Sequence, residues 1–84
     1  MVTKKVKIQL ENGLDARPVA MLVQVASKFD SRIYLLSDGK KVNAKSIMGM
    51  MSLGLDNGEE VTVSADGNDE EAAVAEIEKF LSGK

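Results

Sequence analysis

Two kinds of apolar spacing take turns along this chain, and their order limits the folds that its 84 residues can adopt. Alternating apolar residues, as in Val6, Ile8 and Leu10, are typical of a strand with one buried face. Apolar residues three and four apart, as from Val19 to Phe29, are typical of an amphipathic helix. Because the connections between these segments are short, neighbouring elements are expected to pack against each other.

The first half of the chain reads as strand, helix and hairpin. Asp15 fits the N-cap of a helix that runs to about Lys28, and Asp38-Gly39 is a strong signal for a two-residue hairpin turn. The predicted strands on either side of that turn are 33–36 and 40–44. The helix is expected to bury a stripe made of Val19, Leu22, Val23, Ala26 and Phe29.

The second half adds a short helix, a strand and a last helix. Ser46 is the expected N-cap of a helix over 47–53, which Gly54 ends. Val61, Val63 and Ala65 alternate as a strand. Asn68 or Asp69 is the expected cap of the last helix, which buries Ala73, Val74, Ile77, Phe80 and Leu81. The order β-α-β-β-α-β-α predicts one α+β domain over 1–84, with a mainly antiparallel sheet and the helices on one face. The spacing leaves the strand order open.

Composition excludes several classes of function. The chain has no histidine and no cysteine, so it lacks the usual metal ligands, the usual general base and any thiolate chemistry. A net charge of −2 and only 4% aromatic residues do not fit RNA recognition or any direct nucleic-acid binding. No segment approaches the roughly 18 apolar residues of a membrane span. We expect a cytoplasmic protein that is not an enzyme and uses neither metal nor cofactor.

The first candidate site is the stretch NGLDARP at 12–18. A helix start and the forked donors of Arg17 together suit an anion, phosphate above all. The alternative is structural: Asp15 caps the helix, Arg17 is a solvated charge and Pro18 is harmless in the first turn. The residues alone leave both readings open.

The second candidate site surrounds Ser46. Its hydroxyl is either a helix cap alone or a phosphorylation site, because a phosphate is well placed at a helix start, with Lys41 and Lys45 adding positive charge nearby. Helical spacing turns Met48 outward as an adaptable contact, while Ile47, Met50 and Met51 are expected to lie mostly against the core. Three core methionines are the alternative.

Two blocks of the sequence carry a resemblance to a known family. NGLDARP at 12–18 and KKVNAKSIMGMMSLG at 40–54 resemble the corresponding stretches of HPr, the small phosphocarrier of the bacterial sugar phosphotransferase system. The chain is most similar in character to the Crh branch, the catabolite-repression HPr-like proteins. The resemblance covers essentially the whole chain and implies an open-faced β-sandwich of four strands and three helices.

The resemblance also implies what the missing histidine means. In the family the phosphoryl group is carried by a His at the position of Asp15, so this chain is not expected to carry phosphohistidine. Arg17 and Pro18 still match the family's loop, which makes Asp15, Arg17 and Pro18 a degenerate phosphocarrier site. Asp15 then has three possible roles: cap and interface residue, permanent mimic of the phosphorylated form, or acyl-phosphate acceptor.

By the same resemblance, a bifunctional HPr kinase/phosphorylase phosphorylates Ser46. The product then acts as corepressor for the catabolite control protein, a regulator of LacI type. Partner contacts are expected from Ile47, Met48, Met51, Arg17, Asp15 and Ala20. The expected state is a monomer or a weak, strand-swapped homodimer. Two alternatives remain: a phosphocarrier variant, natural or engineered, that uses Asp15, and a degenerate paralogue with neither activity.

Overall fold

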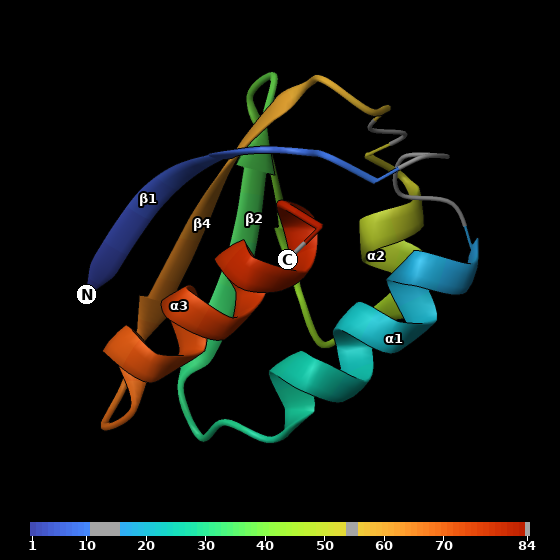
Figure 1. Ribbon diagram of the computed structural model, residues 1–84. Helices are drawn as coiled ribbons and strands as arrows, with labels where there is room; N and C mark the ends of the chain where they lie inside the picture. The colour runs from blue at the N-terminus through green and yellow to red at the C-terminus, as the bar shows by residue number, and fades with distance from the viewer. Residues whose placement is uncertain (11–15, 54–55, 84) are drawn as a thin grey trace.

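The predicted order of strands and helices is the order in the computed structural model, which describes residues 1–10, 16–53 and 56–83. The strands are β1 (Val2–Lys7), β2 (Arg32–Ser37), β3 (Lys40–Asn43) and β4 (Glu60–Asp66). The helices are α1 (Ala16–Ser27), α2 (Ile47–Met51) and α3 (Glu70–Leu81). The helices lie together on one side of the sheet (Figure 1), so the α+β class and the βαββαβα order are confirmed.

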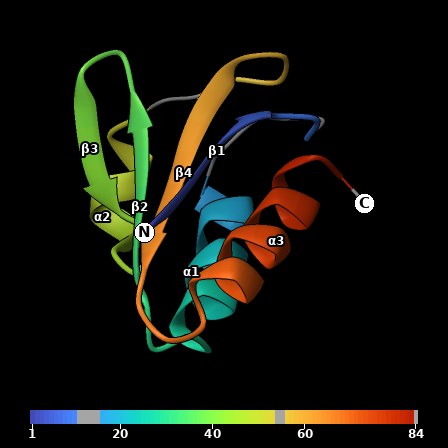
Figure 2. The ribbon, with the colours of Figure 1, turned by 90° about the vertical axis from the view of Figure 1, so that its left-hand side faces the viewer.

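The four strands form one antiparallel sheet in the order β1-β4-β2-β3 (Figure 2). In this register Val6 of β1 lies opposite Val61, and Leu35 of β2 lies opposite Val63. Residues opposite each other point to the same face of a sheet. All four of these side chains are buried, so the register itself places the apolar set of each strand under the helices.

The turn between β2 and β3 is the predicted two-residue hairpin. Ser37 pairs with Lys40, and the two residues between them, Asp38 and Gly39, have φ angles of 53° and 77°. Positive φ at both central residues defines a type I′ turn, whose twist matches that of the flanking strands.

The predicted helix faces largely form the core. Val19, Leu22 and Ala26 of α1 are buried, while Val23 and Phe29 are partly buried against them. On α3 four residues of the predicted face are buried: Ala73, Val74, Ile77 and Leu81. The fifth, Phe80, is partly buried against the core.

Strands β2 and β3 and the end of α1 lie within one residue of the predicted bounds, and β1 and α2 differ by more. Strand β1 begins at Val2 and ends at Lys7, before the end of the alternating apolar residues in the sequence. The next residue, Ile8, still donates its N–H to Glu59 O at 2.8 Å. Helix α2 ends at Met51 because the N–H of Ser52 bonds to Met48 O and Gly49 O, which closes the last turn. The predicted stop at Gly54 lies outside the described residues.

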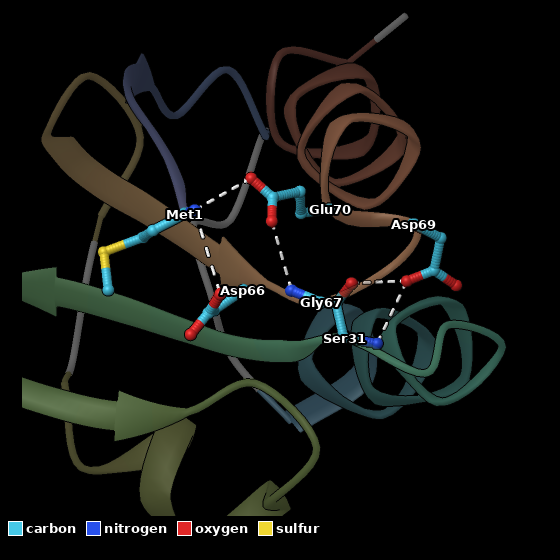
Figure 3. Close-up of polar contacts among 6 residues, drawn as sticks. All are labelled: Met1, Ser31, Asp66, Gly67, Asp69 and Glu70. Carbon is cyan, nitrogen blue, oxygen red and sulfur yellow. Dashed lines mark hydrogen bonds and ion pairs between the residues drawn. The ribbon is translucent and has the colours of Figure 1, made fainter.

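Asp69 stands at the N-cap position of α3, as predicted, but its side chain makes no bond to the helix. Its carboxylate instead accepts the N–H group of Asp30 at 2.9 Å. It also accepts the N–H of Ser31, at 3.0 Å, and the Ser31 hydroxyl (Figure 3). The carboxylate therefore joins the start of α3 to the loop between α1 and β2. These hydrogen bonds, the one from the Ser31 hydroxyl first, lower the pKa of Asp69 from its ordinary value.

Glu70 makes the neighbouring contacts at the start of α3. One carboxylate oxygen accepts the N–H of Gly67 at 3.2 Å, and the other lies 2.9 Å from the amino group of Met1 (Figure 3). The bond from that amino group is the main reason why the pKa of Glu70 lies below its ordinary value. The contacts of Asp69 and Glu70 thus join the start of α3 to the residue before β1, the residue after β4 and the α1–β2 loop.

Candidate regulatory site

Ser46 is the N-cap of α2, as the sequence predicts. Its backbone is extended, with φ −115° and ψ 114°, and its Oγ accepts the N–H of Gly49 at 3.2 Å. Its carbonyl accepts the N–H of Met50 at 3.1 Å. The side chain is half-buried, so the hydroxyl caps the helix while its residue stays in contact with solvent.

A tight turn holds Ser46 in this position. The N–H of Ser46 donates to Asn43 O at 3.0 Å, and the N–H of Lys45 donates to the Asn43 side-chain oxygen at 2.8 Å. Asn43 is the last residue of β3, so the sheet itself sets where α2 begins.

The two lysines near Ser46 have partners of their own. Lys45 Nζ donates to Phe29 O at 2.7 Å, in the loop that follows α1. Lys41 Nζ lies 4.4 Å from the centre of the Tyr34 ring, a cation–π contact across β2 and β3. The ammonium groups of Lys41 and Lys45, which were expected to add positive charge near Ser46, therefore contact Tyr34 and Phe29 in this structure.

The methionines of α2 divide into buried and exposed. Met50 is fully buried, whereas Met48 is 85% exposed, which agrees with the outward direction predicted for Met48. Ile47 and Met51 are 46% and 47% exposed, so the expectation that they lie mostly against the core is wrong. We call Ile47, Met48 and Met51 the α2 surface; its large apolar side chains lie directly after Ser46.

Gly49 leaves room beside the Ser46 hydroxyl. A Cβ at this position would lie 3.3 Å from Ser46 Oγ and 3.6 Å from Val42 Cβ, which is closer to Oγ than ordinary van der Waals contact. Sequence reasoning missed this role, since a glycine inside a short helix signals only low helix propensity.

The start of α1 lies beside α2 (Figure 1), and the two helices are in contact. Arg17 is exposed in the first turn of α1, and Pro18 and Ala20 are half-buried. The structure thus brings α1, which carries the described residues of the first motif, into contact with the helix that Ser46 caps. Asp15, with its predicted capping role, lies outside the described residues.

Neither a metal site nor a membrane span is found in the part of the chain that the structure describes. Within 1–10, 16–53 and 56–83, no three His, Cys, Asp or Glu side chains are grouped to hold a metal ion. None of the described helices is long and apolar enough to cross a membrane.

Comparison with known proteins gives full-length matches. Residues 2–83 match a family model described as "PTS HPr component phosphorylation site". The HPr-like protein Crh of Halalkalibacterium halodurans is 53% identical over 81 residues, which cover 96% of each chain. Crh of Bacillus subtilis is 51% identical over 81 residues, covering 96% of this chain and 95% of the relative.

Solved structures agree with these matches. A phosphocarrier protein HPr from Bacillus anthracis superposes with a TM-score of 0.93 at 45% identity, covering 95% of both chains. A crystal structure of Bacillus subtilis Crh superposes with a TM-score of 0.82 at 49% identity, covering 100% of this chain and 97% of the other. That Crh is described as a dimer with a swapping domain.

Proposed function

Because the chain belongs to the HPr family, we propose that it is a regulatory protein of carbon catabolite repression, switched by phosphorylation of Ser46. The enzyme that modifies it is a bifunctional HPr kinase/phosphorylase, and the protein acts in the cytoplasm without catalysing a reaction. The observation that carries the proposal is the position of a half-buried hydroxyl, that of Ser46, two residues before the 85% exposed Met48.

Phosphate at Ser46 is compatible with the fold. The hydroxyl already accepts the Gly49 N–H at the start of α2, where added negative charge is favourable. A phosphate brings close to two negative charges and strong acceptor oxygens, which suit a basic patch on a partner. The modification therefore changes the surface that the protein presents and leaves the core in place.

The partner of the phosphorylated form is the catabolite control protein, a regulator of LacI type, for which this chain acts as corepressor. The α2 surface supplies the apolar contact, and Arg17 and Ala20 belong to helix α1, which is in contact with α2. Asp15 belongs to the same proposed contact set and acts as cap and interface residue.

The same reasoning separates the protein from a phosphocarrier. The chain has no histidine, so no phosphohistidine forms on it, and Asp15, Arg17 and Pro18 are a degenerate phosphocarrier site. The alternative function is a phosphocarrier that uses Asp15 as acceptor.

Intact mass distinguishes the two functions. With ATP and an HPr kinase, the protein is expected to gain one phosphate, and Ser46→Ala is expected to gain none. Ser52→Ala is the matched control, because Ser52 is an exposed serine at the other end of α2, and this variant is expected to be phosphorylated normally. With phosphoenolpyruvate and the first phosphotransferase enzyme, the mass is expected to stay unchanged. A phosphate that appears there and is absent from Asp15→Asn contradicts the proposal.

We also propose that the chain exchanges β1 with a second copy to form a weak homodimer. Among the described pairings β1 bonds only to β4, over Val2–Lys7, and it contributes the buried Val6 to the core. A second copy offers the same β4 edge, so exchange replaces each contact by an identical one. Sedimentation over a range of concentrations tests this, and a single monomeric species throughout contradicts it.

A further inference from the structure

We propose that Met48 and Met51 are an oxidation site, at which a peroxide converts the thioethers to sulfoxides and so weakens partner binding. The inference rests on the proposed function, because the partner is the catabolite control protein. It adds a second modification, a reversible redox one, to the surface beside Ser46.

The exposure of the methionines decides which thioethers a small oxidant reaches. Met48 is 85% and Met51 47% exposed, whereas Met50, between them in the chain, is fully buried. Oxidation of buried methionines disrupts cores, while oxidation of exposed ones changes only the surface. The α2 methionines that are accessible are therefore those whose modification leaves the fold intact.

Two other methionines are accessible and provide a comparison. Met1 is 77% exposed at the start of β1, and Met21 is 54% exposed on α1. We expect both to be oxidised as well, and Met21 is matched to Met51 in exposure. They differ from Met48 and Met51 in lying outside the α2 surface, so they separate oxidation in general from oxidation at this surface.

The sulfoxide changes what the α2 surface can bind. A thioether is apolar, polarisable and flexible, which suits an adaptable contact with an apolar partner surface. A sulfoxide carries an S=O group that accepts hydrogen bonds strongly, and burying it against apolar atoms leaves that oxygen without a donor. We expect binding to weaken by roughly tenfold or more when Met48 is oxidised.

The reaction needs only one co-reactant in each direction. Hydrogen peroxide transfers one oxygen atom to the sulfur, its O–O bond breaks, the sulfur is oxidised by two electrons and one water leaves. Methionine sulfoxide reductases reverse the change with a dithiol, which becomes a disulfide as the oxygen departs in water.

The first experiment follows oxidation alone. The protein is treated with hydrogen peroxide, quenched at intervals and mapped by peptide mass spectrometry. Met48 and Met1 are expected to gain oxygen first, Met21 and Met51 next, and Met50 last. Circular dichroism is expected to stay unchanged until Met50 reacts. Oxidation of Met50 as fast as Met48 overturns the assignment.

The second experiment measures binding. Ser46-phosphorylated protein is titrated against the catabolite control protein before oxidation, after it, and after reductase treatment. Binding is expected to weaken on oxidation and to recover on reduction. In a Met48→Leu, Met51→Leu double variant, affinity is expected to be the same before and after peroxide. Met21→Leu is expected to remain as sensitive as the unsubstituted chain.

The outcomes separate this inference from the proposed function. If the untreated phosphoprotein does not bind, the proposed function is wrong. If it binds equally well before and after complete oxidation of Met48 and Met51, the oxidation site has no effect and only the inference is overturned. If Met21→Leu, and not the double variant, keeps its affinity after peroxide treatment, the assignment of the effect to the α2 surface is likewise overturned.

Discussion

At the scale of single residues, Asp69 is the clearest case of a side chain whose role depends on a distant segment. Its carboxylate accepts hydrogen bonds from Asp30 and Ser31, which lie 39 and 38 residues away in the sequence. These bonds favour the ionised form, so the pKa of the carboxyl is lower in the folded protein than in the unfolded chain. Stability therefore depends on the protonation of this residue.

We expect Asp69→Asn to be less stable than the unsubstituted protein near neutral pH, by a difference that shrinks in acid. A lowered pKa stabilises the fold above the ordinary pKa of Asp, about 3.9, and the effect is lost as pH falls through the folded-state pKa. The gap in free energy of unfolding is therefore constant above about pH 5 and closes in acid. Urea titrations from pH 3 to 7 measure it.

Glu71→Gln is the control for this titration, because Glu71 is an exposed carboxylate in the same first turn of α3. We expect this variant to track the unsubstituted protein over the whole range. If the difference in free energy of unfolding between Asp69→Asn and the unsubstituted protein stays unchanged at pH 3, the lost stability does not come from the charge of the carboxylate.

Gly67 is the second residue that the loop contact constrains. It has φ +157°, and a Cβ there would lie 2.7 Å from Ser31 Cα, a backbone atom that cannot turn aside. Gly58 has φ +93° with nothing within 4 Å of its Cβ direction. We expect Gly67→Ala to cost about 2 kcal/mol or more beyond the cost of Gly58→Ala, which carries backbone strain alone. Equal losses in thermal or urea unfolding would contradict the clash.

At the scale of elements, α2 shows which parts of a helix the sequence can orient. Its start was predictable, because Ser46 is a strong N-cap residue and the hairpin before it fixes the chain direction. Its sides were predictable only in part, because five residues make less than two turns and the helical period does not separate the residues in the core from those beside it. The sequence placed Met48 and Met50 correctly, and Ile47 and Met51 wrongly.

A series of alanine substitutions in α2 tests these sides. We expect Met50→Ala to cost about 2–5 kcal/mol, because it empties a buried site. Met48→Ala is expected to lie within about 0.5 kcal/mol of zero, and Met51→Ala between the two. Free energies from urea unfolding rank them. A loss at Met48 as large as that at Met50 would mean that Met48 packs in the core.

Gly49 links the geometry of α2 to its proposed modification. Gly49→Ala adds a good helix former, worth about 1 kcal/mol, but sets a Cβ 3.3 Å from the Ser46 hydroxyl, a close contact that offsets this gain and crowds the proposed phosphorylation site. We expect little change in stability and a fall of roughly tenfold or more in kcat/KM for phosphorylation of Ser46. Ser52→Ala is the control on the same helix. Phosphorylation of Gly49→Ala at the normal rate would show that the space is not needed.

At the scale of the whole molecule, the sequence predicted the elements and their class but not the order of the strands. Local spacing identifies Val6 and Val61 as inward-facing, yet nothing in it pairs the first strand with the last. That pairing spans most of the chain and depends on the packing of β1 and β4 under α3. The contact between Asp69 and Ser31 could not be predicted either, because the two residues are 38 apart in the sequence. The contact between α1 and α2 was indicated only by the family resemblance.

The strand order makes a prediction about how the molecule opens. β4 and β2 have a neighbour on each side, whereas β1 and β3 are edge strands of the described sheet. We expect amide exchange to be fastest in the short β3, slower in β1 and slowest in β4 and β2, which open only on global unfolding. Hydrogen exchange followed by NMR at increasing urea measures the opening free energy of each strand.

The position of β1 in that series bears on the proposed exchange between copies. Val6 and Ile8 hold β1 to the core, so it must open more rarely than β3. If its opening free energy is lower than that of β4, β1 detaches while the rest stays folded, and a second copy can take its place. Lys4→Ala is expected to lower the opening free energy of β1 further, because the substitution removes the ion pair at 2.9 Å between Lys4 and Glu78 of α3. Equal values for β1 and β4 would mean that exchange requires complete unfolding.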